Sequence, residues 1–216
     1  NIATDGGGGI DNFGLQGNAS PTITNCIFYA NTALTAGGMY CWGGNTGGNS
    51  SPVILNCIFA NNTATAGNAG GIIADNADAS GGTNSGTSNP VVRNSIFWGN
   101  TATGAGPQFA IKGTGTFIAT YSDIDIAGQF APHIISGAGT GNIFSNPLFL
   151  NIADGNGADN CWLTNDDGLT LQNISPAINA GNNPGVPALD LLFSTRIING
   201  IVDMGAYEFQ SILLNM

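Results

Sequence analysis

The chain has 216 residues, of which only 7% are charged while 42% are hydrophobic. Disordered chains combine low hydrophobicity with a high net charge, so this composition favours a folded protein. Lys and Arg together number 3 against 13 Asp and Glu, which gives a net charge of −10. This balance argues against nucleic acid and anionic membrane surfaces as partners, since both attract clustered basic side chains. No stretch is apolar for the roughly 18 residues that a membrane-spanning helix needs.

One pattern of nine residues occurs three times, at 25–33, 56–64 and 94–102. The copies read NCIFYANTA, NCIFANNTA and NSIFWGNTA. A short run led by proline precedes each copy, and a diglycine followed by an apolar residue lies further upstream. Repetition at a period of about 30 residues is typical of a solenoid. We therefore expect an all-β fold, a parallel β-helix of four to five rungs whose corresponding side chains stack.

Residues 1–9 resemble the end of a repeat, with Asn1 in the position of Asn31. The chain is therefore expected to begin inside a rung. One interpretation is that a second copy completes this rung, giving head-to-tail stacking into a filament or matrix. A longer parent chain is the alternative. The loops at 11–20, 43–51 and 74–89 differ in length between repeats and are expected to be exposed turns.

Two columns of identical or similar side chains are expected along the solenoid. The first is an amide ladder at a corner, and the second is a column of reduced thiols and a hydroxyl. Either the Ile or the Phe of the repeat should point into the core, with a bend near the preceding Asn. The ladder residues are Asn31, Asn62 and Asn100, and the column residues are Cys26, Cys57 and Ser95. A disulfide between Cys41 and Cys161 stays open.

The repeat weakens toward the C-terminus. Residues 104–126 read as a degenerate fourth rung and 142–150 as part of a fifth. We therefore divide the chain into β-helix rungs at 1–150 and a non-repetitive C-terminal cap region at 151–216, packed on the β-helix and covering its open end. Arg196 is expected to form an ion pair in this region with Asp190, Asp203 or Glu208.

Two resemblances to known families follow. The Gly-Gly-[Ile/Met] and Phe-x-x-Asn repeats resemble those of polymorphic outer-membrane and autotransported adhesins. The C-terminal part resembles the choice-of-anchor Q domain of bacterial surface proteins in the pectate-lyase-like β-helix superfamily. Its motifs are NPLF at 146–149, DGLTL at 167–171, SPAINAG at 175–181 and VDMGAYE at 202–208. This resemblance implies a right-handed β-helix in a secreted or cell-surface protein, and it implies no defined catalytic activity.

An acidic, glycine-rich stretch is the candidate metal site. Its oxygen-bearing side chains suit Ca²⁺, which takes six to eight oxygen ligands. The alternative is a pair of turns in a solvated loop. The candidate ligands are Asp154, Asn156, Asp159, Asp166 and Asp167.

Asp123 and Asp125 are the candidates for acid–base chemistry in a polysaccharide lyase or hydrolase. The alternative is an exposed strand edge. His133 is the only histidine, and we interpret it as a turn or surface residue.

Aromatic faces can stack on sugars, which makes Tyr40, Trp42 and Trp98 candidate glycan-binding residues. Scarce charge and the lack of a catalytic cluster that recurs from rung to rung favour a non-enzymatic, secreted or cell-surface protein. Its role would be structural or adhesive, with extracellular glycans or other copies of itself as partners. The alternatives are a polysaccharide-active enzyme and a glycan-binding module.

Overall fold

A computed structural model of the chain describes residues 1–77, 86–127 and 140–210, so His133 lies outside the described residues. These residues contain strands and no helix. The first sheet holds β1 (Ile10–Phe13), β5 (Met39–Trp42), β9 (Ile72–Asp75) and β13 (Phe109–Lys112). The second holds β2 (Thr22–Thr24), β6 (Val53–Leu55), β10 (Val91–Arg93) and β14 (Ile118–Thr120). The third holds β3 (Ile27–Tyr29), β7 (Ile58–Ala60), β11 (Ile96–Trp98) and β15 (Asp123–Ile124). A fourth, shorter sheet holds β4 (Thr32–Ala33), β8 (Thr63–Ala64) and β12 (Thr101–Ala102).

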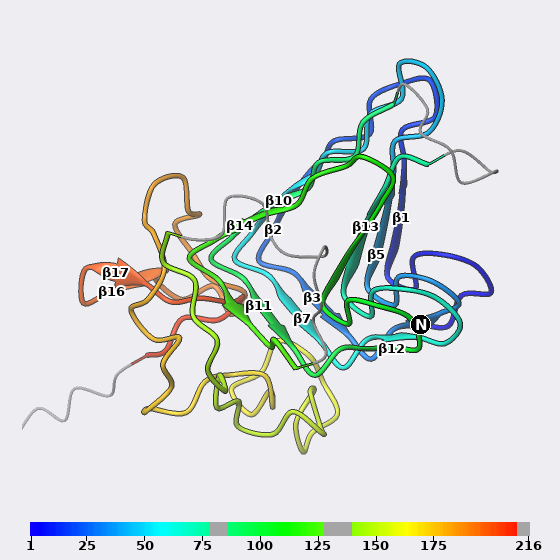
Figure 1. The fold of residues 1–216 in the computed structure, drawn as a ribbon. Helices are drawn as coiled ribbons and strands as arrows, with labels where there is room; N and C mark the ends of the chain where they lie inside the picture. The colour runs from blue at the N-terminus through cyan, green and yellow to red at the C-terminus, as the bar shows by residue number, and fades with distance from the viewer. Residues whose placement is uncertain (78–85, 128–139, 211–216) are drawn as a thin grey trace, which may run out of the picture.

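These four sheets are parallel, and each pairs corresponding strands of successive repeats. The chain therefore winds through the four sheets once per repeat, which makes a parallel β-helix of about four rungs (Figure 1). This confirms the predicted fold class. A short antiparallel hairpin, β16 (Ile197–Ile198) and β17 (Ile201–Val202), lies in the non-repetitive part.

The phenylalanines of the repeat face the core. Phe28, Phe59 and Phe97 stack nearly parallel, with ring centroids 4.2 and 4.6 Å apart and interplanar angles of 5° and 7°. The predicted bend is present at the preceding asparagines, of which Asn25 and Asn56 both have φ of 50°. This left-handed conformation, which Asn tolerates well, turns the chain between the second and third sheets.

The repeated diglycine reflects close backbone contact between rungs. A Cβ on Gly37 would lie 2.4 Å from the backbone nitrogen of Thr63. A Cβ on Gly38 would lie 2.6 Å from the carbonyl oxygen of Gly71. Because these neighbours are backbone atoms that cannot move aside, a side chain at either position would force the rungs apart.

The corner asparagines form a continuous amide ladder. Each Nδ2 donates to the amide oxygen of the next rung, from Asn1 through Asn31, Asn62 and Asn100 to Gln108, at 3.0, 2.9, 2.8 and 2.6 Å. The same oxygens accept backbone N–H groups, as Asn62 Oδ1 does from Asn31 at 3.0 Å. The ladder thus satisfies polar backbone at a buried corner, a structural role.

The cysteine column continues with hydroxyl groups. The backbone N–H of Cys57 donates to Ser95 Oγ at 3.1 Å, in the core next to Cys26. All four cysteines are free thiols. Cys41 is buried and Cys161 is exposed, and the two do not form the disulfide that the sequence left open.

Residues 146–209, which we call the side segment, lie along the β-helix and not across its open end as expected. Figure 1 shows this yellow-to-red segment beside the stacked strands. The reason is the outer surface of the third sheet, where the repeat isoleucines Ile58 and Ile96 pack with Met204 and Tyr207 in a second apolar cluster. An apolar column on the outside of a rung needs a cover, and the side segment supplies it.

The bend asparagines hold the side segment in place. Their Nδ2 groups donate to its backbone carbonyls in three successive rungs. The bonds run from Asn25 to Leu189 (2.8 Å), from Asn56 to Asp203 (3.2 Å) and from Asn94 to Asn182 (2.9 Å). A repeated residue of the motif thus anchors a part of the chain that does not repeat.

Arg196 is fully buried in the side segment, and it forms no ion pair with a described carboxylate, contrary to the expectation. Its guanidinium donates to the carbonyl oxygens of Gly205 and Ala206 instead. Burial lowers the pKa of Arg196, while nearby Glu208 and Asp190 oppose that shift. These carboxylates accept backbone N–H groups, so they and Arg196 each stabilise the turns of this segment.

Candidate functional site

The outer surface of the first sheet carries the candidate site. Side chains alternate along each strand, and the outward residues of neighbouring strands line up in register. One outward column runs Phe13, Trp42, Asp75, Lys112 across β1, β5, β9 and β13. A second outward column places Tyr40 beside Asp11 and Ile73. Four rungs thus contribute to one surface.

Asp75 is the centre of its polar contacts. Its carboxylate is 1% exposed and accepts a 2.6 Å hydrogen bond from the Tyr40 hydroxyl. Lys112 Nζ lies 3.2 Å from the same oxygen, Oδ2, while its side chain is 50% exposed. The other oxygen accepts the backbone N–H of Ala77 at 2.8 Å. Burial and the hydrogen bond to Asp75 raise the pKa of Tyr40, so its hydroxyl stays a donor.

Three aromatic rings lie beside this polar group. The Phe13 ring centroid is 5.2 Å from that of Trp42, at 66°, and 5.8 Å from that of Tyr40, at 56°. Trp42 Nε1 donates to the carbonyl oxygen of Ala77 at 3.0 Å, which fixes the indole. Phe13 is 49% exposed. The three rings therefore form an aromatic surface that is fixed in place and partly exposed to solvent.

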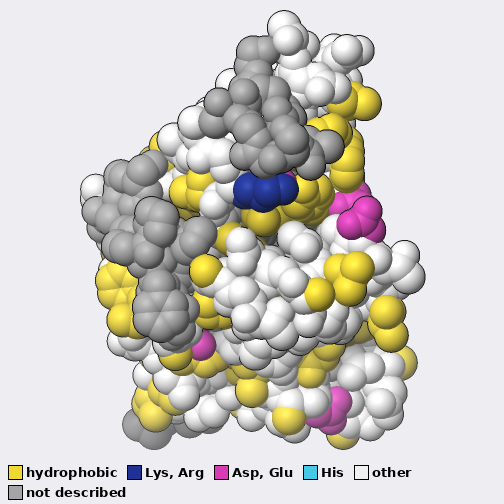
Figure 2. Space-filling view, turned by 45° about the vertical axis from the view of Figure 1, so that its right-hand side comes forward, with side chains coloured by type: hydrophobic (Ala, Val, Ile, Leu, Met, Phe, Trp, Pro, Cys, Tyr) yellow, Lys and Arg dark blue, Asp and Glu magenta, His cyan; other side chains and the backbone are white. Residues whose placement is uncertain are grey.

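Two adjoining hollows mark this surface, and together we call them the aromatic cleft. One, of about 220 Å³, lies among Phe13, Tyr40, Trp42, Asp75 and Lys112. The other, of about 330 Å³, shares Tyr40, Asp75 and Lys112 and extends to Thr35 and Asn68. Figure 2 shows this side of the molecule, with basic atoms set among hydrophobic side chains and acidic groups nearby.

Two further acidic residues lie at or next to the cleft. Asp5 lines both hollows, and Asp11 lies next to Tyr40 in the outward column. Both are exposed, and neither forms an ion pair within the described ranges. Partial burial and the neighbouring charge of Asp5 raise the pKa of Asp11.

The structure divides the three predicted glycan-binding residues. Tyr40 and Trp42 lie together in the cleft, whereas Trp98 packs against the cluster beneath the side segment, next to Phe149 and Ile152. The two tryptophans lie apart because Trp98 belongs to the third sheet and Trp42 to the first.

Sequence reasoning missed Phe13, Asp75 and Lys112. Phe13, Trp42 and Asp75 each stand three residues after the apolar residue that follows a diglycine. Aligning the repeats on the diglycine would have placed these three in one column. Lys112 carries no such signal, since the fourth rung has lost the diglycine.

The predicted calcium ligands lie in one loop of the side segment, and hydrogen bonds occupy several of them. Asp159 Oδ1 accepts the N–H of Cys161 at 2.8 Å, and Asp166 Oδ1 accepts the Thr164 hydroxyl at 2.8 Å. Asp167 is fully buried and accepts the Tyr207 hydroxyl at 2.5 Å. No group of three or more acidic, His or Cys side chains in the described ranges is placed to hold a metal ion. Calcium binding through Asp154, Asn156 and these carboxylates stays a prediction.

The alternative expectation, that Asp123 lies at an exposed strand edge, is wrong. It stands in register with Ile96, and the surrounding apolar cluster leaves it fully buried. One oxygen accepts the N–H of Ser145 at 3.2 Å, and the other has no hydrogen-bond partner among the described residues. Burial raises the pKa of Asp123 to about 7. Asp125 is half-buried, and its Oδ1 accepts the N–H of Ala127. A substrate therefore does not reach the pair together.

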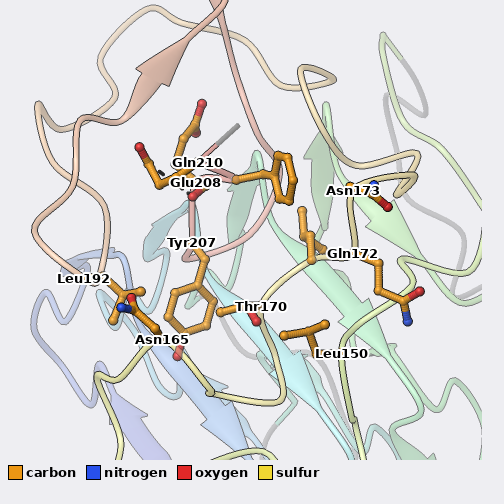
Figure 3. A pocket seen from close by; sticks show the side chains of 11 residues that line it. Leu150, Asn165, Thr170, Gln172, Asn173, Leu192, Tyr207, Glu208 and Gln210 are labelled. Atoms are coloured by element: carbon orange, nitrogen blue, oxygen red, sulfur yellow. Dashed lines mark hydrogen bonds between the residues drawn. The ribbon is translucent and has the colours of Figure 1, made fainter. Parts of the chain in front are cut away.

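A larger hollow of about 500 Å³ lies in the side segment, between Leu150, Leu192 and Tyr207. In Figure 3 the side chains of Glu208 and Gln210 point away from Leu150. The Tyr207 hydroxyl is bonded to Asp167, and Glu208 accepts the backbone N–H of Asp203 at 3.0 Å. The aromatic cleft, with the exposed ring of Phe13 and the half-exposed Lys112, remains the candidate site.

Comparison with protein-family models, with curated proteins and with solved structures found no match. Among the described residues, no helix is long and apolar enough to cross a membrane.

Proposed function

We propose that this protein is a non-enzymatic, extracellular β-helix protein with an adhesive role, and that it binds glycans in the aromatic cleft. The observation that carries the proposal is that three aromatic side chains lie next to a buried carboxylate and a half-exposed lysine. The aromatic residues are Phe13, Tyr40 and Trp42, and the charged residues are Asp75 and Lys112. Binding sites of this kind combine aromatic walls with a few fixed polar groups that set orientation.

The cleft suits sugars for two reasons. A sugar ring has an apolar face that can cover Phe13 and Trp42, whose rings are held by each other and by the bond to Ala77. Its hydroxyl groups can bond to the ammonium of Lys112, whose side chain is 50% exposed. Because the protein side is fixed before binding, little conformational entropy is lost on association.

Binding is favoured over catalysis by the state of Asp75. Both of its oxygens are occupied, by Tyr40 and Lys112 on one side and by Ala77 on the other. A general acid or base needs an oxygen within hydrogen-bond reach of the substrate. Asp75 instead acts as a positioning group for Tyr40 and Lys112.

Self-association is a second proposal. In the described chain β1, β2 and β3 lie at the edges of their sheets. Edge strands present unpaired N–H and C=O groups that can pair with another strand. A second copy, or residues that precede Asn1 in a longer chain, would satisfy these groups equally. Electron microscopy of the purified chain supports assembly if it shows filaments, and monodisperse short rods contradict it.

A glycan array followed by calorimetry tests the binding proposal. The wild type should bind at least one class of oligosaccharide, and Trp42→Ala or Phe13→Ala should weaken binding about tenfold or more, which corresponds to about 1.4 kcal/mol. Phe144→Ala is the matched control, because Phe144 is 52% exposed and lies outside the cleft. No binding to any glycan contradicts the proposal. Release of sugar fragments that Asp125→Ala abolishes would favour the polysaccharide-active enzyme instead.

A further inference from the structure

The aromatic cleft carries more negative than positive charge. Asp75 accepts the hydrogen bond from the Tyr40 hydroxyl, Asp5 lines both hollows, and Asp11 lies beside Tyr40 in the outward column. Lys112 is the basic residue at the cleft, and it pairs with Asp75. Asp5 and Asp11 therefore face solvent with no cation opposite them among the described residues.

The geometry keeps these two carboxylates next to the aromatic surface. Asp5 lines both hollows, and Gly6 directly after it packs on the Tyr40 ring, where an added Cβ would lie 3.1 Å from Cγ. Asp11 is in register with Tyr40, and its Oδ1 turns back over Gly7. A ligand in the hollow beside Tyr40 thus lies near two exposed carboxylates.

We propose that the glycan recognised in the cleft carries a positive charge, as a protonated hexosamine does, with its ammonium group placed between Asp5, Asp11 and the Tyr40 ring. This proposal rests on the proposed function and names the class of sugar. Carboxylates attract an ammonium group directly, and aromatic faces attract it through their quadrupole. A neutral sugar uses the stacking surface and Lys112 but gains no charge attraction from Asp5 and Asp11, and a uronic acid is repelled by these two carboxylates.

Lys112 allows a further prediction about the charge of the ligand. As a cation that is 50% exposed at the cleft, it opposes a positively charged ligand and would favour an acidic one. Removing its charge should therefore strengthen the binding of an amino sugar and weaken the binding of a uronate. A site that used Lys112 as its main charged contact would behave in the opposite way.

The test compares a β-linked glucosamine oligomer with the fully N-acetylated oligomer of the same length, at mildly acidic pH and low salt. We expect the amine form to bind about tenfold more tightly, as two exposed ion pairs and a cation–π contact together allow. High salt should remove this preference, because the Debye length falls to about 3 Å at 1 M.

Charge variants locate the effect. Asp5→Asn combined with Asp11→Asn should bring the two affinities within about twofold of each other, chiefly by weakening the binding of the amine form. Asp159→Asn, an exposed carboxylate outside the cleft, is the matched control and should keep the preference. Lys112→Gln should increase the affinity for the amine form.

The outcomes separate the two proposals. Equal binding of both oligomers, unchanged by the aspartate variants, overturns the amino-sugar inference and leaves glycan binding intact. Tighter binding of a uronate oligomer overturns the inference in the same way. Binding of no glycan on the array overturns both.

Discussion

The hydroxyl of Tyr40 donates a 2.6 Å hydrogen bond to Oδ2 of Asp75, a carboxylate that is 1% exposed. The two residues lie on adjacent rungs, in β5 and β9, so the bond joins successive turns of the solenoid. Because Lys112 contacts the same oxygen from the next rung, one buried carboxylate fixes side chains from three rungs on the cleft surface. The stability of the rungs and the proposed glycan binding should therefore depend on the same bond.

Tyr40→Phe tests this coupling. The substitution keeps the ring and leaves Asp75 buried with one donor fewer, so we expect the free energy of unfolding to fall by about 1–3 kcal/mol. Glycan affinity should fall less than it does in Trp42→Ala, because the aromatic surface remains. Urea denaturation measures the stability change. Tyr121→Phe is the control and should stay within about 0.5 kcal/mol, since no hydrogen bond joins the Tyr121 hydroxyl to a described residue. Equal losses in both variants contradict the prediction.

The amide ladder gives a second prediction. Asn62 lies in its middle, where its side chain donates to Asn100 and Phe28 and accepts from Asn31. Asn62→Ala leaves several buried polar groups without partners, and we expect a loss of about 3–5 kcal/mol. Asn1→Ala removes only the terminal donor to Asn31 and should cost about 1 kcal/mol or less. Thermal denaturation compares the two, and similar losses would show that the ladder adds little.

The fold was predictable because aligning the copies of the repeat shows which residues of successive rungs pair. Three copies of one motif fix which strands pair, and the stacked ring planes of Phe28, Phe59 and Phe97 follow from identical side chains in register. The choice between Ile and Phe as the inward residue was not predictable from alternation alone. It depends on the left-handed asparagine before them, and on the side segment that covers Ile58 and Ile96.

The candidate site was predictable only in part. Tyr40 and Trp42 were found as aromatic residues, but Asp75 and Lys112 belong to rungs whose sequences have diverged at these positions. Their convergence comes from stacking along the solenoid axis, which places residues that are far apart in the sequence in one column. Residue type alone also did not show that Trp98 lies apart from Tyr40 and Trp42, because residue type does not tell which sheet a residue belongs to.

Calcium binding by the 154–167 loop is tested by titration. Asp159 and Asp166 already accept backbone or hydroxyl hydrogens, so an ion must compete with these bonds. We expect weak binding, in the range of about 10⁻⁴–10⁻³ M found for extracellular modules, and a higher melting temperature at millimolar Ca²⁺. Asp166→Asn should abolish the rise, whereas Asp5→Asn, outside the loop, should preserve it. A melting temperature that EDTA and Ca²⁺ leave unchanged contradicts calcium binding.

The pH dependence of stability follows from the buried carboxyl groups. Burial raises the pKa of Asp123 from 3.8 to about 7 and that of Glu208 from 4.5 to about 7. Between about pH 4 and pH 7, these two carboxyl groups are protonated in the folded state and ionised in the unfolded state. The free energy of unfolding therefore falls as the pH rises from about 4 to about 7, and the protein should be most stable in mild acid.

Asp123→Asn isolates the larger part of this effect. The amide stays uncharged at every pH, so the variant should lose part of the pH dependence and exceed the wild type in stability above pH 7. The full change for Asp123 is on the order of 4 kcal/mol, because one pKa unit corresponds to about 1.4 kcal/mol. Chemical denaturation across the pH range measures it, with the exposed Asp159→Asn as a control that keeps the wild-type slope. Wild-type stability that rises from mild acid to neutral pH contradicts the prediction.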